Sequence, residues 1–146
     1  MIYDLRPSIT VSALIASSID LVWHQWTSPE HITQWNFASD DWYAPSAIND
    51  LQVGGKFSFG MAAKDGSFSF DLEGEYLDIV IHHKITYQLA DGRMVWITFE
   101  STDEGVLLTE TFEPEQENSH ELQQAGWQAI LNNFKKYVEG QHSDAS

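Results

Sequence analysis

The residue whose type and position could most directly support chemistry is Glu110. It alternates with Leu108 and Phe112 in the segment 106–112, and residues two apart in a strand face the same side of a sheet. If that side is apolar, desolvation raises the pKa of the carboxyl and leaves it in need of a partner. Glu110 is therefore the candidate catalytic residue, as an acid or base, and a candidate anchor for a ligand that carries a hydrogen-bond donor.

Two alternatives for Glu110 stay open at this point. It pairs with Arg93, Lys56 or a histidine near the sheet edge, or a bulge in its strand turns it toward solvent. Tyr87 alternates with Ile85 on another expected strand, and a buried phenol usually finds a hydrogen-bond partner. Its hydroxyl is the second polar group expected on the apolar face.

The histidines predict no metal site. His82 and His83 are adjacent on or just before an expected strand, so their side chains point to opposite faces. His24 and His31 lie seven positions apart in the sequence, on two different expected helices. Neither pair has the ligand spacing of a histidine metal centre, and we expect no metal and no other cofactor.

An irregular segment over residues 36–47 combines acidic and aromatic side chains. Asp40, Asp41, Trp42 and Tyr43 follow one another there, and aromatic rings beside carboxylates suit the mouth of a ligand cavity. The alternative is that Trp42 plugs the open end of the sheet while the two aspartates are merely solvated. Loops of this length often carry function.

The elements that must position these residues are mostly antiparallel strands. From about Asn49 to Glu113 the chain alternates apolar and polar residues with period two, as in strands of a sheet with one apolar face. Glycine-containing pairs separate the strands where a tight turn needs a positive φ. These pairs are Gly54-Gly55, Asp65-Gly66, Asp91-Gly92 and Glu104-Gly105.

Helices are expected on either side of this meander. A strand over residues 8–16 precedes a helix capped by Ser17, and Ser28-Pro29 opens a second short helix. A long amphipathic helix begins at the cap Asn118, runs to about Val138 and ends before Gly140. Its apolar stripe comprises Trp127, Ile130, Leu131, Phe134 and Val138.

Composition narrows the function classes. The 146 residues, of which 42% are hydrophobic, suit a single domain over residues 1–146, with an ordered core at about 8–139 and a polar tail at 140–146. A formal net charge of −15 argues against binding to nucleic acid or to an anionic membrane. The chain has no cysteine, and we find no signal peptide or membrane-spanning segment. We therefore expect a cytoplasmic monomer or weak homodimer, paired through an exposed edge strand.

Four stretches resemble one protein family. They are "TSPE" at 27–30 between Trp23 and Trp35, "LQVGGKFSF" at 51–59, "DGSFSFDLEGEYLDI" at 65–79 and "GWQAILNNFKKYVE" at 126–139. In this order they resemble the START-like (SRPBCC) superfamily, in its group of homologues of the C-terminal domain of the heat-shock-protein ATPase activator, often labelled polyketide-cyclase-like. The resemblance implies an α+β helix-grip fold, in which a curved antiparallel sheet of six to seven strands wraps around the C-terminal helix.

The resemblance also implies a cavity between sheet and helix for a hydrophobic or amphipathic small molecule. Our leading hypothesis is a binding domain of this kind, without catalysis. The alternatives are a cyclase- or lyase-type enzyme that uses Glu110, and a co-chaperone that activates a heat-shock-protein ATPase. The expected ligand-binding residues are Trp35, Phe37, Trp42, Tyr43, Phe59, Phe70, Tyr87, Ile97, Phe99, Glu110, Phe112 and Phe134.

Overall fold

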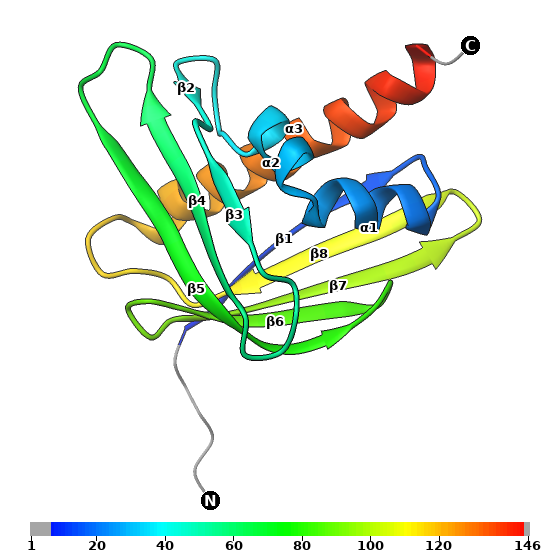
Figure 1. Cartoon of the computed structure of the whole chain (residues 1–146), viewed down its shortest axis with the longest axis horizontal. Helices are drawn as coiled ribbons and strands as arrows, with labels where there is room; N and C mark the ends of the chain where they lie inside the picture. The colour runs from blue at the N-terminus through cyan, green and yellow to red at the C-terminus, as the bar shows by residue number, and fades with distance from the viewer. Residues whose placement is uncertain (1–6, 145–146) are drawn as a thin grey trace, which may run out of the picture.

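A curved antiparallel sheet and three helices make up the fold (Figure 1), seen in a computed structural model that describes residues 7–144. The elements are β1 (Ile9–Ile15), α1 (Ile19–Thr27), α2 (Pro29–Trp35), β2 (Trp42–Tyr43), β3 (Ala47–Asn49), β4 (Lys56–Ala63), β5 (Ser69–Val80), β6 (Lys84–Leu89), β7 (Met94–Thr102), β8 (Gly105–Phe112) and α3 (His120–Asp144). The strand order is β1-β8-β7-β6-β5-β4-β2, and β3 also pairs with β4. The predicted α+β helix-grip fold is confirmed.

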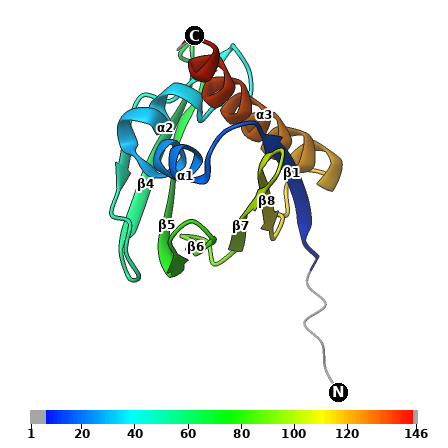
Figure 2. The ribbon, with the colours of Figure 1, turned by 90° about the vertical axis from the view of Figure 1, so that its right-hand side faces the viewer.

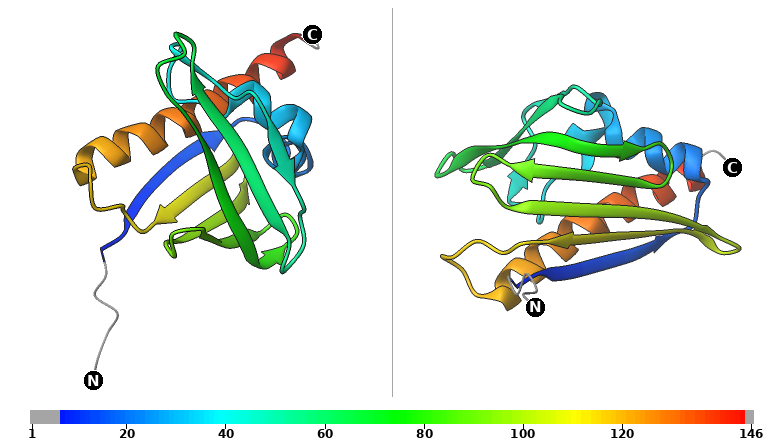
Figure 3. Two further views of the ribbon diagram at one scale, coloured as in Figure 1. Left: turned by 60° about the vertical axis from the view of Figure 1, so that its left-hand side comes forward. Right: turned by 90° about the horizontal axis from the view of Figure 1, so that it is seen from below.

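The sheet curls into a half-barrel whose open side is covered by helices. Figure 2 shows α3 on one side of the opening and α1 with α2 on the other, while Figure 3 shows the strands from the outside. The pairing of β5 with β6 shifts register between Tyr76 and Asp78, and such a bulge bends a strand and increases its twist. The apolar core lies between the concave face and the helices.

Tight turns join the strands at the four predicted places. Gly54, Gly66, Gly92 and Gly105 all have positive φ angles. At Gly105 a side chain is excluded for a second reason, because a Cβ atom would lie 2.1 Å from the carbonyl oxygen of Ile15. The meander that the glycine pairs predicted is therefore confirmed.

Side chains of α3 hold the helix against the edge strand β1. The Gln128 Nε2 donates to the Ser12 carbonyl at 2.9 Å, and the Lys135 Nζ donates to the Leu14 carbonyl at 2.5 Å. β1 pairs only with β8, so these carbonyls belong to its unpaired edge. Part of the β1 edge is therefore already hydrogen-bonded to α3. The expected homodimer stays a prediction, and the edge available for it is the opposite one, at β2 and β3.

The helix boundaries differ slightly from the predictions. Ser18, not Ser17, caps α1, because its Oγ accepts from the Leu21 amide at 3.3 Å. Ser119, not Asn118, caps α3, because its Oγ accepts from the Leu122 amide at 3.1 Å. Each error is one residue, and it arises because adjacent polar residues offer equally good caps.

α2 begins at the predicted Pro29. The predicted end of α3 was wrong, because the helix continues through Gly140 to Asp144. A single glycine lowers helix stability by only about 1 kcal/mol and need not end a helix.

Candidate functional site

A cavity of about 490 Å³ lies between the concave face of the sheet and the N-terminal half of α3. Its wall is mainly aromatic and aliphatic, and its size falls within the range of about 300–1,000 Å³ usual for small-molecule sites. Most of the expected ligand-binding residues line it. These are Trp35, Phe37, Trp42, Phe59, Phe70, Tyr87, Ile97 and Glu110.

Two of the expected residues pack between helix and sheet instead of lining the cavity. Phe99 lies with its ring 5.0 Å from Trp23. Phe134 is fully buried, with its ring 4.9 Å from Trp26 and 4.8 Å from Trp35. Phe99 and Phe134 point toward the interior, as the cavity residues do. Side chains of the short helices α1 and α2 fill the space next to them, however, so their assignment to the cavity wall was wrong.

The other two expected residues lie on opposite sides of the wall. Phe112 is fully buried beneath Trp127, with stacked rings 3.9 Å apart, so Trp127 and not Phe112 faces the cavity. Tyr43 is 44% exposed, because it follows Trp42 in β2 and adjacent strand residues point to opposite faces. Trp42 itself lines the cavity near the rings of Phe68 and Phe70.

Several lining residues were missed, some with a signal in the sequence and some without. Met61 and Leu72 line the cavity, and each lies two residues from an expected member, Phe59 and Phe70, so strand periodicity identifies them. Trp26 stacks on Trp35 at 4.8 Å and also lines the cavity. Helical spacing placed Trp26 in the core, and the same spacing cannot tell core from cavity wall.

Glu110 is the buried acidic group of the cavity wall. It is 4% exposed, and its partners in register are Val11 on β1 and Ile97 on β7, both buried and apolar. No hydrogen bond or ion pair joins its carboxyl to any residue that the structure describes. Desolvation raises the pKa of Glu110 from 4.5 to about 8, so the carboxyl is mostly protonated at neutral pH.

The alternatives considered for Glu110 do not hold in the structure. The β7–β8 pairing runs without a register shift from Val95↔Phe112 to Thr102↔Gly105, so no bulge turns the side chain outward. The Arg93 Nε is 2.8 Å from an Asp91 carboxylate oxygen instead.

Tyr87 places a second polar group in the same wall. It is 8% exposed, and burial raises the pKa of its hydroxyl well above the usual value of 10, with a further contribution from the Glu110 charge. No hydrogen bond joins this hydroxyl to another residue within the described part of the chain. The Tyr76 hydroxyl, by contrast, donates to Asn49 Oδ1 at 2.6 Å. Tyr87 and Glu110 thus form a pair of neutral donors without protein acceptors.

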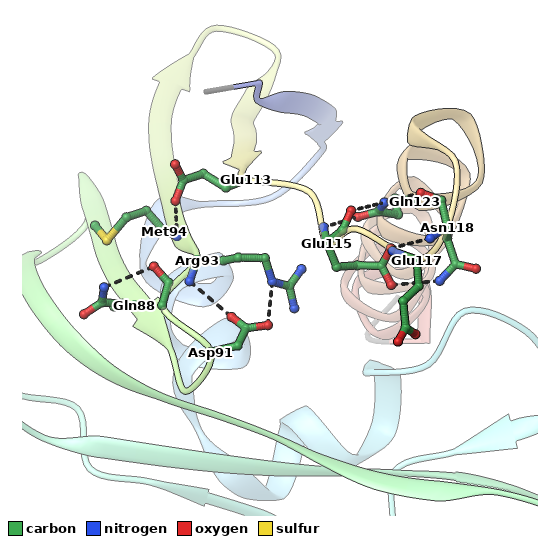
Figure 4. A network of polar contacts seen from close by, with 10 residues as sticks. Gln88, Asp91, Arg93, Met94, Glu113, Glu115, Glu117, Asn118 and Gln123 are labelled. Carbon is green, nitrogen blue, oxygen red and sulfur yellow. Dashed lines mark hydrogen bonds and ion pairs between the residues drawn. The ribbon is translucent and has the colours of Figure 1, made fainter. Parts of the chain in front are cut away.

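The mouth of the cavity is polar and lies between two loops. Arg93, in the β6–β7 turn, points toward the segment before α3 (Figure 4), where Glu115 and Asn118 also line the cavity, as does Gln123 in the first turn of α3. The Glu115 carboxylate accepts from the Asn118 amide at 2.6 Å, and this bond is the main cause that lowers the pKa of Glu115, with a smaller contribution from Arg93. Gln123 accepts from the Glu115 amide at 2.8 Å.

The histidines whose side chains the structure describes lie away from the cavity. His83 is exposed, and His82 occupies a turn with φ 69° and lies 3.3 Å from an Asp20 carboxylate oxygen. His24, with His31 and a neighbouring carboxylate, forms a group that could hold a metal ion; none of these residues lines the cavity.

Fold and cavity together define the class: a START-like domain. Within it, residues 16–139 match the family model described as "Activator of Hsp90 ATPase homolog 1-like protein". The chain belongs to this family.

Solved structures agree with this assignment. The AHSA1-like protein from Aeromonas hydrophila is 41% identical over 93% of this chain and 94% of that one, with a TM-score of 0.87. A protein from Cytophaga hutchinsonii is 44% identical over 94% of both chains, with a TM-score of 0.77. A protein from Nitrosomonas europaea, 17% identical over 97% of this chain and 99% of that one, shares the fold, with a TM-score of 0.81.

Comparison with curated proteins gives no match. Within residues 7–144, no helix has both the length and the apolar character needed to cross a bilayer. The cytoplasmic location stays a prediction.

Proposed function

We propose that this protein binds a hydrophobic or amphipathic small molecule in the cavity beneath α3. The observation that carries the proposal is the Glu110 carboxyl, 4% exposed and without a protein partner in the described chain, in the wall of a largely apolar cavity of about 490 Å³. A buried polar group without a hydrogen bond costs about 1–3 kcal/mol. A ligand that supplies the missing acceptor recovers this cost, and its apolar part replaces water along the aromatic wall.

The protonation state of the wall favours a ligand with a neutral acceptor. At neutral pH the Glu110 carboxyl is mostly protonated and the Tyr87 hydroxyl fully so, because burial raises both pKa values. Both groups then donate hydrogen bonds. A carbonyl or hydroxyl oxygen suits two donors, whereas a carboxylate must be desolvated deep in the cavity at a high cost.

Three probes with the same tail and different head groups test this proposal. 1-Decanol, decanoate and decylammonium are titrated at pH 7 while the thermal unfolding midpoint is followed, since a molecule that binds only the native state raises it. We expect saturable stabilisation that is largest for decanol. Native mass spectrometry of gently purified protein complements the titration by detecting a ligand retained from the cell.

Variants then connect binding to Glu110. Glu110→Leu should weaken decanol binding about threefold to tenfold, the usual worth of one hydrogen bond, while Glu110→Gln keeps a donor and most of the affinity. Glu100→Gln is the matched control, because Glu100 is exposed on the neighbouring strand β7. Equal decanol affinity in the wild type and Glu110→Leu, or no saturable binding of any probe, would contradict the proposal.

A second candidate function is proton-transfer catalysis in the same cavity. The observation in its favour is the pKa of about 8 at Glu110, which is close to the working pH that suits a general acid or base. Glu110 would move the proton while the Tyr87 hydroxyl polarises a substrate carbonyl. Turnover of a cyclase or lyase substrate that disappears in Glu110→Gln, with folding and binding retained, would support this function over simple binding.

A third candidate is activation of the Hsp90 ATPase, which rests on the family description. An activator should bind the ATPase directly and increase its rate without any small molecule. A steady-state ATPase assay with and without this protein tests the role. An unchanged rate at saturating protein would exclude it.

A further inference from the structure

We propose that His24, Glu30 and His31 form a binding site for a divalent transition-metal ion, with Zn²⁺ as the best-fitting ion. His24 belongs to α1, and the other two residues belong to α2. One ligand atom from each side chain lies within 4.8 Å of the other two. This site is separate from the cavity, and none of the three residues lines it.

The turn between α1 and α2 brings the two histidines together. Ser28 is the C-cap residue of α1 and the N-cap residue of α2, so the two helices follow one another directly, and the rings of His24 and His31 lie 5.2 Å apart. On a straight helix, a separation of seven positions would place the two side chains about two turns apart. The sequence places His24 and His31 on two different helices, as the structure does, but it does not give the distance between their rings.

Hydrogen bonds hold both rings by the same nitrogen. The His24 Nδ1 lies 3.1 Å from the Ser28 Oγ, and the His31 Nδ1 lies 2.6 Å from the Tyr137 hydroxyl. When Nδ1 donates to a hydroxyl oxygen, the lone pair is on Nε2, which is then free to bind a metal ion. A metal-binding histidine almost always has its other nitrogen fixed in this way.

The donor set and its mobility suit zinc. Two imidazoles and one carboxylate are ligands that zinc accepts, and three protein ligands leave a fourth position for water. Zinc–ligand distances of about 2.0–2.2 Å require donor atoms to approach to roughly 3.3 Å. His24 and Glu30 are exposed, so their side chains can rotate by the amount needed.

No cation competes for the carboxylate of the site. Glu30 makes no ion pair with any residue in the described part of the chain. The net charge of −15 adds a long-range attraction for cations. Since Tyr137 belongs to α3, a bound ion would link α1 and α2 directly and α3 through the His31 ring.

Zinc titration of the tag-free chain tests the site. Isothermal titration calorimetry with Zn²⁺ should show one ion per chain, and His24→Ala or His31→Ala should weaken binding at least tenfold. Glu30→Gln should also weaken it. His120→Ala is the matched control, because it removes an exposed histidine at the start of α3 and should leave the affinity unchanged.

Two outcomes would overturn the proposal. The first is equal zinc affinity in the wild type, His24→Ala and His31→Ala. This result would mean that the ion binds to scattered surface carboxylates instead. The second comes from NMR of the imidazole nitrogens: Zn²⁺ should shift Nε2 of both His24 and His31, and the absence of that shift contradicts the geometry. Tyr137→Phe should weaken binding about tenfold if the hydroxyl orients the His31 ring, and unchanged affinity would remove Tyr137 from the site.

Discussion

The two halves of α3 have the same apolar pattern and bury it differently. In the C-terminal half Phe134 and Val138 are fully buried, whereas in the N-terminal half Trp127 and Ile130 stay partly exposed and line the cavity. One half packs onto the sheet and the other spans a hollow. Amphipathic periodicity therefore sets which face of a helix turns inward, but not how close the opposite wall comes.

Local residues explain why the two halves differ. Trp26 and Trp35 reach the C-terminal half from α1 and α2, and their rings pack against Phe134. The N-terminal half has Gly126 facing the cavity, and a Cβ atom placed there would meet nothing within 4 Å. Large rings fill the space on one side, and the lack of a side chain helps to leave it open on the other.

The largest expected effect is on the packed half. Phe134→Ala should lower the free energy of unfolding by about 3–5 kcal/mol, because it leaves a cavity among rings that cannot collapse. Ile130→Ala is the control from the N-terminal half, which faces the cavity. It should lower the free energy of unfolding by roughly 1 kcal/mol, because the side chain is already partly exposed. Urea unfolding followed by tryptophan fluorescence measures both. Equal losses in the two variants would refute the difference between the halves.

An effect of intermediate size, which depends on pH, is expected on the free energy of unfolding. It comes from Glu110, in the cavity wall opposite the N-terminal half of α3. Its pKa is raised to about 8 in the folded protein from the usual 4.5, so the folded state retains a proton that the unfolded state has lost between these values. Its contribution to stability is therefore complete below about pH 4.5 and is lost as the pH rises toward 8. The slope is at most about 1.4 kcal/mol per pH unit.

The variant Glu110→Gln isolates this contribution. Relative to the wild type, it should gain about 2.5 kcal/mol of unfolding free energy between pH 5 and pH 7, because an amide has no charge to desolvate. Urea unfolding at several pH values measures the difference, and Glu100→Gln on the exposed face controls for the change in net charge. A difference independent of pH would mean that the Glu110 carboxyl is solvated in the folded state.

The inward direction of Glu110 could be predicted from the sequence. In a strand without a bulge, residues two apart point to the same face, so Glu110 must point inward with Leu108 and Phe112. The fold could be predicted for a similar reason, since the glycine turns, the two helix starts and the final amphipathic helix each depend on local patterns. These features require only the period of the chain and the conformational preferences of single residues.

The limits of the cavity and the histidine cluster could not be predicted in this way. Whether Phe112 or Trp127 faces the cavity depends on which of the two stacked rings covers the other. That order depends on the distance between α3 and β8. His24 meets His31 because of the angle between two short helices. Arg93 lies across the cavity mouth from Glu115, and these residues are brought together by the β6–β7 turn and the loop before α3. Such distances result from packing between distant segments.

The smallest expected stability change is at Gly126, in the N-terminal half of α3 that faces the cavity. Gly126→Ala should stabilise the protein by about 0.5–1 kcal/mol through helix propensity alone, since the new methyl group meets no neighbour. Gly140→Ala should gain a similar amount, because Gly140 also lies within α3 with open space around it. Thermal or urea unfolding measures both, and a loss in Gly126→Ala would mean that no space exists beneath this turn.

A larger side chain at the same position separates space from function. Gly126→Leu should project into the cavity, keep the fold and reduce the affinity for 1-decanol at least tenfold, because the leucine occupies the volume that the ligand tail needs. Gly140→Leu places the same side chain on the same helix away from the cavity and should leave binding unchanged. Unaltered decanol binding in Gly126→Leu would place the probe outside the hollow. The cavity beneath the N-terminal half of α3 would then be a packing defect that binds no ligand, and Glu110 would lose its proposed role.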